Sequence, residues 1–363
     1  MKSYHVLGIM SGSSMDGMDI SLCKISTDGQ QFSYQIEESE TFDYPEKWRI
    51  RLSQLRKADS MAYAKTDVFY GHYIGQQINQ FIEKHQLKVD LIASHGHTVF
   101  HYPDERITRQ VGDGASISAI TNLPVVSDFR SMDVAKGGQG APLVAIGDEL
   151  LFNEYDYCLN LGGFANISGK VGPYRVSFDI CPANIILNRT ARDLNLDYDK
   201  DGEIAAKGAI NYTLLENLNQ IDYYKKPFPK SLNRDWINSE LWQIVKDGEK
   251  LLPEDKMKTF VDHIGFQISN SIDYLSQKNA TGKKVLVTGG GAFNHTLMDY
   301  IKTHSDAEFI IPNEKLVKYK ESLIFALMGV LRITNQTNIF KTYTGASSDS
   351  VSGSLNGDFS KLL

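Results

Sequence analysis

Three apolar segments of this 363-residue chain each run directly into a glycine-rich turn. They read YHVLGIMSGSS at 4–14, YCLNLGGFAN at 157–166 and KVLVTGGGAFN at 284–294. A continuous apolar run indicates a strand that is buried on both faces, and glycine lets the backbone turn sharply or approach a ligand closely. The chain is therefore predicted to fold around buried sheets that present glycine turns at their strand ends.

Amphipathic helices are predicted between these strands. Apolar residues recur at helical spacing over 65–85 and 260–275, and shorter apolar helices are predicted over 142–152 and 321–331. Further strands are predicted at 19–26, 89–98, 123–130 and 174–180. Because strands alternate with helices, the pattern favours an α/β fold.

The chain is too long for one ordinary hydrophobic core and suits about two domains. A glycine turn with polar side chains follows a strand in each half of the chain, which is consistent with two halves that face each other across a cleft. No Pro/Ser-rich tether separates the halves. We expect residues 1–130 plus 340–363 to form the first lobe and residues 131–339 to form the second.

Composition limits the kinds of binding partner and the cellular compartment that we expect for this chain. The formal net charge of −6 argues against a nucleic-acid partner, which would favour a basic surface. Lys225, Lys226 and Lys230 form a cluster that a solvated loop explains. The N-terminus lacks a signal peptide's apolar region, and no apolar run is long enough to span a bilayer. Three cysteines without metal-type spacing suit a reducing compartment, so a cytoplasmic protein with no membrane partner is expected.

The glycine turns do not match the standard nucleotide motifs. The turn at 12–17 has P-loop spacing, but Met18 stands where that motif needs lysine, and no strand is followed by G-x-G-x-x-G. The missing side chains at 162–163 and 289–291 would let a phosphate or a flat ligand approach the backbone. A tight strand-to-helix turn is the alternative at 289–291, but three such turns in one chain favour nucleotide binding.

The first glycine turn differs from the other two because it contains several hydroxyl and carboxylate side chains that could bind ions. Backbone N–H groups and the hydroxyls of Ser11, Ser13 and Ser14 could point at an anion. Asp16 and Asp19 could help to hold a divalent cation through water, because Mg²⁺ keeps much of its hydration shell. The alternative is a hairpin turn in which these serines and acids cap local backbone groups.

Asp179 is the candidate general base. The segment SFDICPAN at 177–184 places it at a strand end. A carboxylate there suits a base, because the strand fixes the side chain while the following loop admits substrate. The alternative is that Asp179 caps the helix that begins with the residues after it.

Three histidines lie close together in SHGHTVFH at 94–101. On a helix, the H-x3-H spacing of His97 and His101 would place two imidazoles on one face for a metal ion. Gly96, the β-branched residues between them and Pro103 favour a strand end and loop instead. We therefore expect histidines that line a pocket, and metal ligation is the alternative.

Arg130 and Glu321 are further candidates, each with a structural alternative. Arg130 could form a bidentate contact with a substrate carboxylate, or a structural ion pair with a nearby acid. Glu321 could serve the site, or it could complement the N-terminal dipole of the helix that is predicted to begin there.

Taken together, these segments resemble the anhydro-N-acetylmuramic acid kinases, which are cytoplasmic bacterial enzymes of cell-wall recycling with the fold of actin and hexokinase. The resemblance runs almost end to end, through GIMSGSSMDGMD, SHGHTVFHYP, VVSDFRSMDVAKGGQGAPL, LNLGGFANIS, TGGGAFN and KESLIFALMGVLR. The family commonly has DTGPGN where this chain reads DICPAN at 179–184, Gln where His97 stands and Thr where Ser13 stands.

The resemblance implies an α/β, two-lobed, ribonuclease H-like ATPase fold, with ATP and its Mg²⁺ in the cleft between the lobes. It implies that Asp179 is catalytic and that His95, Arg130 and Glu321 bind the sugar. No direct protein ligand to the metal is expected, because Asp16 or Asp19 would act through water. The residues implied to bind the nucleotide are Gly12, Ser13, Ser14, Met15, Asp16, Gly17, Met18, Asp19, Gly162, Gly163, Gly289, Gly290 and Gly291.

The implied reaction opens the internal ether of 1,6-anhydro-N-acetylmuramic acid with water and phosphorylates the oxygen on carbon 6, at the expense of ATP. The resemblance also suggests a homodimer. Three other interpretations stay open. They are another sugar kinase of the same fold, a metal-dependent carbamoyl-transfer ATPase that would use His97 and His101, and a non-enzymatic binding protein gated by ATP.

Overall fold

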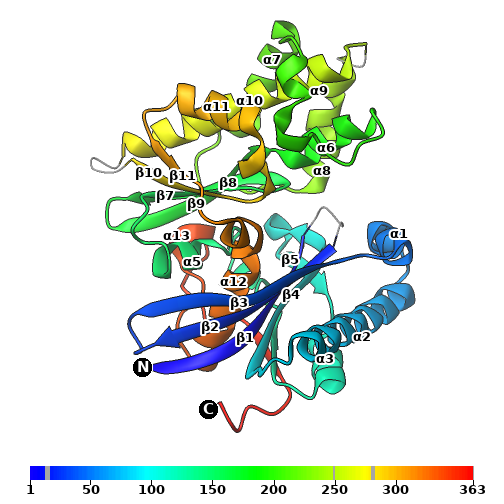
Figure 1. The fold of residues 1–363 in the computed structure, drawn as a ribbon, viewed down its shortest axis with the longest axis vertical. Coiled ribbons are helices and arrows are strands. Elements are labelled where there is room, and N and C mark those ends of the chain that lie inside the picture. The colour runs from blue at the N-terminus through cyan, green and yellow to red at the C-terminus, as the bar shows by residue number, and fades with distance from the viewer. Residues whose placement is uncertain (13–16, 248–249, 279–282, 363) are drawn as a thin grey trace. The chain divides into compact units, whose positions relative to one another are not determined.

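The computed structural model describes residues 1–12, 17–247, 250–278 and 283–362. The chain forms two compact units, each with its own sheet and core (Figure 1). Unit 1 comprises Met1–Leu151 together with Tyr319–Leu363, and unit 2 comprises Phe152–Lys318.

The sheet of unit 1 has the strand order β12-β6-β4-β1-β2-β3, and β5 pairs with β4. Strands β1, β2 and β3 form an antiparallel meander, β4 runs parallel to β1, and β6 runs parallel to β4. Strands β5 and β12 are antiparallel to their neighbours. The strands are β1 (Lys2–Ser11), β2 (Gly17–Thr27), β3 (Phe32–Asp43), β4 (Leu91–Tyr102), β5 (Ile107–Val111), β6 (Val125–Ser127) and β12 (Ser354–Asn356).

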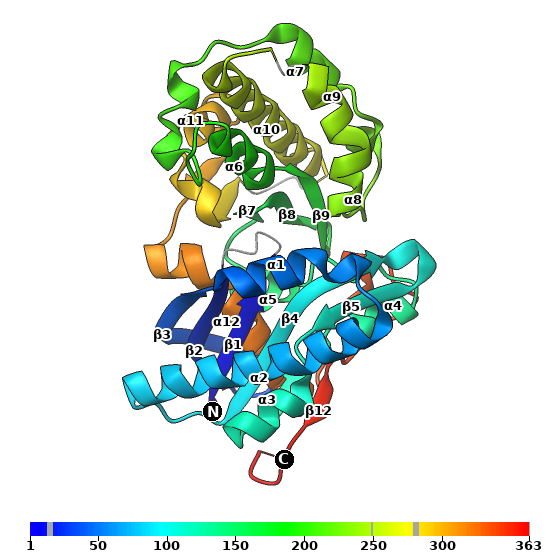
Figure 2. The same ribbon diagram turned by 90° about the vertical axis from the view of Figure 1, so that its right-hand side faces the viewer.

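Helices cover both faces of this sheet (Figure 2). Apolar side chains of α2, such as Ile74 and Ile78, pack with Leu7 and Ile9 of β1. On the opposite face, a Cβ added to Gly8 would lie 1.8 Å from the carbonyl oxygen of Ser322, so only glycine lets α12 approach β1 this closely. The helices are α1 (Glu46–Gln54), α2 (Ser60–His85), α3 (Gly114–Thr121), α4 (Ser131–Ala135), α5 (Ala145–Leu150), α12 (Glu314–Ile333), which belongs to unit 1 from Tyr319 onward, and α13 (Lys341–Thr344).

Unit 2 repeats this arrangement with the strand order β11-β10-β7-β8-β9. Its first three strands form an antiparallel meander, and β10 and β11 follow in parallel beside β7. Its strands are β7 (Tyr157–Leu161), β8 (Phe164–Val171), β9 (Tyr174–Pro182), β10 (Lys284–Thr288) and β11 (Glu308–Ile310). Its helices include α6 (Asn184–Arg192), α7 (Tyr212–Asn219), α8 (Arg234–Trp236), α9 (Trp242–Asp247), α10 (Pro253–Ser276) and α11 (His295–Thr303).

The two sheet faces of unit 2 differ in polarity. Leu159, Leu161 and Ile167 lie in the hydrophobic core that includes α10. The residues that alternate with them, such as Cys158, Asn160 and Ser168, point to the other face, since successive strand side chains alternate. The unit therefore buries one apolar sheet face under helices and keeps a polar face.

The matching strand orders confirm the predicted α/β, two-lobed, ribonuclease H-like fold. The observed boundary differs from the predicted one, because residues 131–151 and 319–339 belong to unit 1. Two buried contacts tie these segments to unit 1. Asp133 accepts a 2.7 Å hydrogen bond from Thr344, and Lys320 forms a 2.6 Å ion pair with Asp148.

The predicted strands and the helices at 65–85 and 142–152 are found within a few residues of their expected positions. The helices predicted at 260–275 and 321–331 are present but each begins seven residues earlier, at Pro253 and Glu314. Among the described residues, no helix is both long enough and apolar enough to cross a membrane.

Candidate active site

A row of polar residues crosses the sheet of unit 2 near the carboxyl ends of β7, β9 and β10. Thr288 of β10 pairs with Asn160 of β7, Asn160 pairs with Asn166 of β8, and Asn166 pairs with Asp179 of β9. Directly paired residues share a sheet face, so these four side chains lie on the polar face. A bulge at Ile180 interrupts the register just after Asp179. Bulges often redirect side chains beside functional sites.

Asp179 is held by the segment that follows α7. Its Oδ2 accepts a 2.8 Å hydrogen bond from the backbone N–H of Leu232, and its own N–H donates to the carbonyl of Lys230 at 3.1 Å. The hydroxyl of Tyr223 donates to the Asp179 carbonyl at 2.7 Å. Backbone and side chain are thus both fixed, as a positioned base requires.

The helix-capping alternative for Asp179 is wrong. The N-cap of α6 is Ala183, and no side chain caps this helix. The N–H groups of Ala183 and Ile185 donate to the carbonyl of Gly163, at 2.8 and 3.2 Å, and Asn184 donates to the carbonyl of Gly162 at 3.1 Å. The glycine turn satisfies the helix terminus, so the carboxylate of Asp179 is not needed there.

Lys230 lies beside Asp179, and the interpretation of this lysine as part of a solvated loop is wrong. Its Nζ donates to the carbonyl of Tyr223 at 3.2 Å and lies 4.7 Å from the centre of the Tyr223 ring. Burial lowers the pKa of Lys230 to about 8, while Cys181 and, more weakly, the charge of Asp179 act in the opposite direction. The side chain is therefore a cation within electrostatic reach of the candidate base. No periodicity in the sequence marks this contact, because it depends on how residues 223–232 fold over β9.

The glycine turns of unit 2 come together at the ends of two neighbouring parallel strands, β7 and β10. Gly289 has φ 83°, and an added Cβ would lie 2.7 Å from the side-chain oxygen of Asn160. A Cβ on Gly291 would lie 2.8 Å from that of Leu161. The predicted nucleotide turns at 162–163 and 289–291 thus form one cluster, in which close packing requires glycine at 289 and 291, while Gly162 and Gly290 have room for a Cβ.

The first turn is described only at its flanks, and Ser13, Ser14, Met15 and Asp16 lie outside the described residues. On one flank, Ser11 is buried, accepts a 2.7 Å hydrogen bond from Tyr44 and lies 3.1 Å from Nδ1 of His97. On the other flank, Gly17 opens β2, where an added Cβ would lie 2.7 Å from the carbonyl oxygen of Phe42. Gly12 lies between the end of β1 and the undescribed residues.

Asp19 and Glu321 form a pair of neighbouring acids in unit 1. Burial raises the pKa of Asp19 to about 6, a hydrogen bond from Thr41 at 2.6 Å lowers it, and the charge of Glu321 raises it further. A divalent cation would relieve both the repulsion and the desolvation, and carboxylate oxygens suit Mg²⁺. The pair therefore fits a magnesium-nucleotide site.

Glu321 owes its place to α12. The helix begins at Glu314, so Glu321 lies about two turns inside it, and the interpretation as an N-terminal charge is wrong. The adjacent Ser322 donates or accepts a 2.7 Å hydrogen bond with Ser21 of β2. This contact and the glycine at position 8 fix α12 on the sheet beside Asp19.

The buried His95 and the half-buried Arg130 form a pair at a bulge in β4, where Gly96 has φ 73°. Nδ1 of His95 donates to the carbonyl of Gly96 at 2.8 Å, and Nε2 accepts from Nε of Arg130 at 2.9 Å. Burial and the Arg130 charge hold the pKa of His95 well below its usual value, so the ring is neutral. Both ring nitrogens are used, which favours a role for His95 in positioning Arg130.

His97 and His101 do not form a metal site. They lie on strand β4, where four residues span about 13 Å. His97 lies against Ser11, while His101 lies 3.2 Å from Oγ1 of Thr108, and burial lowers the pKa of His101 to about 4. Nowhere in residues 1–12, 17–247, 250–278 and 283–362 do three His, Cys, Asp or Glu side chains form a metal-type cluster. The carbamoyl-transfer interpretation depended on His97 and His101 as metal ligands, so the structure removes its support.

Comparison with known proteins identifies the class. The family model described as anhydro-N-acetylmuramic acid kinase matches residues 4–357. Curated proteins with this name are 32% identical in Haemophilus influenzae, covering 96% of both chains, and 29% identical in Francisella tularensis subsp. novicida, covering 97% of this chain and 98% of the relative. The chain belongs to the anhydro-N-acetylmuramic acid kinase family.

Similar solved structures are more distant. One is component A of the (R)-2-hydroxyglutaryl-CoA dehydratase of Acidaminococcus fermentans, with a TM-score of 0.43 and 15% identity over 90% of this chain and 97% of that chain. Another is the activator of the 2-hydroxyisocaproyl-CoA dehydratase of Clostridium difficile with bound ADPNP, with a TM-score of 0.41 and 13% identity over 90% of this chain and 94% of that chain.

Proposed function

We propose that this chain is an ATP-dependent kinase that opens 1,6-anhydro-N-acetylmuramic acid with water and phosphorylates its O6. The products are N-acetylmuramic acid 6-phosphate and ADP, in the recycling of peptidoglycan. Membership of the kinase family supports the substrate and the reaction. The observation that carries the mechanism is the fixed carboxylate of Asp179, which no helix terminus requires.

In the proposed reaction, Asp179 takes a proton from water as the water oxygen bonds to the anomeric carbon. The bond between that carbon and O6 breaks, and O6 forms a bond to the γ-phosphorus of ATP while the bond from γ-phosphorus to the bridging oxygen breaks. Proximity of the carboxylate, sugar and phosphate supplies most of the advantage in such a scheme. Lys230 favours the ionised carboxylate that accepts the proton.

The nucleotide is proposed to bind to the glycine turns at 12–19, 162–163 and 289–291. Mg²⁺ would offset the charge of the transferring phosphate. Asp19, with Asp16, would hold the ion through water, and Glu321, whose charge raises the pKa of Asp19, would act on the same ion or on the sugar. Because Mg²⁺ requires ionised carboxylates, its binding would displace the proton that burial favours on Asp19.

The sugar is proposed to meet Arg130, whose guanidinium suits the lactyl carboxylate of the muramic acid. His95 orients that guanidinium through its Nε2. We also propose that the protein acts in the bacterial cytoplasm as a homodimer, on the basis of the family resemblance and the free-thiol state of its three buried cysteines.

The decisive experiment measures ADP release with Mg²⁺ and ATP in ¹⁸O-labelled water. Parallel reactions contain 1,6-anhydro-N-acetylmuramic acid, N-acetylmuramic acid, N-acetylglucosamine or no sugar. ADP release with the anhydro sugar alone, and one solvent oxygen in the phosphorylated product, is the expected result. Turnover of another sugar without label would indicate an ordinary sugar kinase, and hydrolysis independent of sugar would indicate a binding protein gated by ATP.

A further inference from the structure

A pocket of about 270 Å³ lies in unit 1 between α1 and α2. None of its lining residues is assigned to the proposed active site. The wall from α1 consists of Lys47, Trp48 and Arg51. The volume is just below the usual range for small-molecule sites, so it suits a ligand of about the size of a single substituted sugar.

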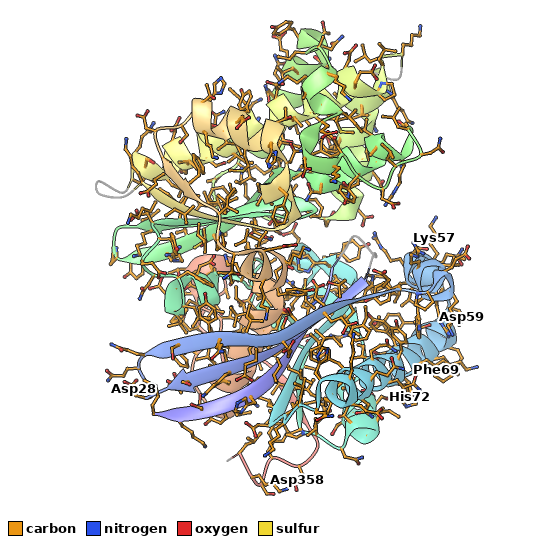
Figure 3. The ribbon with its side chains drawn as sticks, viewed as in Figure 1. Asp28, Lys57, Asp59, Phe69, His72 and Asp358 are labelled. Carbon is orange, nitrogen blue, oxygen red and sulfur yellow. The ribbon has the colours of Figure 1, made fainter. Side chains whose placement is uncertain are left out.

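The wall from α2 consists of Phe69, His72, Tyr73 and Gln76, at positions i, i+3, i+4 and i+7 of one helix face. Figure 3 shows Phe69 and His72 on the outer side of α2. The adjacent stripe of α2 is packed into the core, and the pocket stripe is a separate face that carries two aromatic rings and two polar side chains. Phe69 is 46% exposed, so its ring is open to contact with a ligand.

The pocket is basic within an acidic protein. Its lining contains two cations and no acid, although the chain carries a net charge of −6. Arg51 donates from Nε to Thr66 at 2.9 Å, and its guanidinium lies 5.7 Å from the Trp48 ring and 5.4 Å from the Phe69 ring. An arginine held in this way is preorganised to bind an anion with its terminal amino groups.

The aromatic wall is connected to the phosphate turn. The ring of Trp48 lies 5.3 Å from that of Tyr70, whose hydroxyl is hydrogen-bonded to that of Tyr44. Tyr44 in turn donates to Ser11, the residue before Gly12. A ligand in this pocket would therefore contact a network that ends at the proposed ATP site.

We propose that this pocket binds a phosphorylated sugar. Lys47 and Arg51 would hold the phosphate, while the apolar face of the sugar ring would lie on Phe69 and Tyr73. His72 and Gln76 would meet the ring hydroxyls. The kinase's own product belongs to this chemical class, and the identification of that product as the natural ligand rests on the proposed function. The pocket is then a product-sensing site.

Isothermal titration calorimetry on the full chain, without ATP, tests the site with N-acetylglucosamine 6-phosphate as the probe. N-acetylglucosamine and inorganic phosphate are the comparison ligands. We expect saturable binding of the sugar phosphate and at least about tenfold weaker binding of the other two. Arg51→Gln should weaken binding about tenfold. Lys47→Gln, whose side chain makes no hydrogen bond to any described residue, provides a second variant if Arg51→Gln fails to fold.

Two matched variants separate this site from the active site. Lys57→Gln removes an exposed cation just after α1, outside the pocket, and should bind the probe like the parent (Figure 3). Arg130→Gln should keep the pocket's binding while losing turnover. Unchanged binding in both pocket variants, equal binding of N-acetylglucosamine or phosphate, or no binding at all would overturn the proposal. ADP release is measured in a separate experiment. Failure of the proposed function would abolish sugar-dependent ADP release and leave probe binding intact, whereas failure of this proposal would abolish probe binding and leave ADP release intact.

Discussion

The two units share one strand order but place their acids in opposite electrostatic settings. In unit 1, Asp19 lies near Glu321, and the two negative charges repel each other. In unit 2, Asp179 accepts a hydrogen bond from Leu232 and has Lys230 beside it. The same topology thus produces one site in which two acids repel each other and one in which an acid has a cation nearby.

This difference indicates a division of labour. A pair of repelling, partly buried acids is poised to take up a cation, as a magnesium-nucleotide site requires. A hydrogen bond from an N–H group and a nearby cation both favour the charged form of a carboxylate, which suits a general base. Each unit would then contribute one of the two functions that the proposed reaction combines.

The turns between the first two strands of each unit differ as well. In unit 2, Gly162 and Gly163 alone connect β7 to β8, and their carbonyls hold the start of α6. In unit 1, the five residues at 12–16 connect β1 to β2. The shorter turn serves the protein's own helix, whereas the longer one has serines and an acid to offer to a ligand.

The largest expected effect tests the division of labour directly. Asp179→Asn keeps the shape of the side chain and its acceptor for Leu232 but cannot take a proton. We expect turnover to fall about 1,000-fold, since a positioned base contributes 10²- to 10⁴-fold, while the dissociation constant for ATP stays unchanged. Steady-state ADP release and calorimetry with a non-hydrolysable nucleotide provide the two measurements. Turnover within about twofold of the parent would remove Asp179 as the base.

The second prediction addresses the acids of unit 1. Asp19→Asn removes one carboxylate from the proposed Mg²⁺ site and leaves unit 2 untouched. We expect half-maximal activity to need about 10- to 100-fold more Mg²⁺, the usual loss for a group that acts on a metal through water. Saturating Mg²⁺ should restore most of the activity, in contrast to Asp179→Asn. An unchanged Mg²⁺ requirement would contradict the assignment.

The same variant should be more stable than the parent, and the sign depends on pH. The pKa of Asp19 is raised from 3.8 to about 6, so the folded state keeps its proton while the unfolded chain loses it. The parent therefore loses up to about 3 kcal/mol of stability as pH rises through this range. Thermal unfolding without Mg²⁺ should show a higher midpoint for Asp19→Asn at pH 8 and no gain at pH 4. A gain at both values would point to another cause.

Much of this fold could be predicted from sequence pattern, because apolar periodicity reports burial directly. The stripe of α2 and the runs that form β1, β7 and β10 are examples. The glycine turns at 162–163 and 289–291 could also be placed, since they end neighbouring strands. Strand β3 was not predicted. Phe32, Tyr34 and Ile36 alternate with polar residues, but this pattern gives way to the polar run at 37–41, and no position of the strand is fully buried.

The roles of single side chains were harder to predict. His95 and Glu321 were found as candidates, but their partners depend on a bulge in β4 and on the true start of α12. Lys230 was dismissed because a lysine-rich segment usually faces water. Its position beside Asp179 depends on residues 223–232 crossing β9, a long-range contact that leaves no local pattern in the sequence.

The smallest expected effect concerns the cation of unit 2. Lys230→Met keeps the aliphatic stem and removes the charge that favours the ionised base. We expect the acidic limb of the pH profile of kcat/KM to move up by about one pH unit, which is about a tenfold loss on that limb. Above about pH 8 the parent's Lys230 also loses its proton, so the two proteins should converge there.

Two further variants decide whether the effect comes from charge or from structure. Lys230→Arg keeps the charge at all accessible pH values and should restore the acidic limb. Lys225→Met removes a lysine of the same segment that is exposed and paired with Asp222, and it should leave the profile unchanged. A uniform loss at every pH in Lys230→Met, without rescue by arginine, would mean that Lys230 only braces the loop. The electrostatic contrast between the two units would then rest on Leu232 and Asp179 alone.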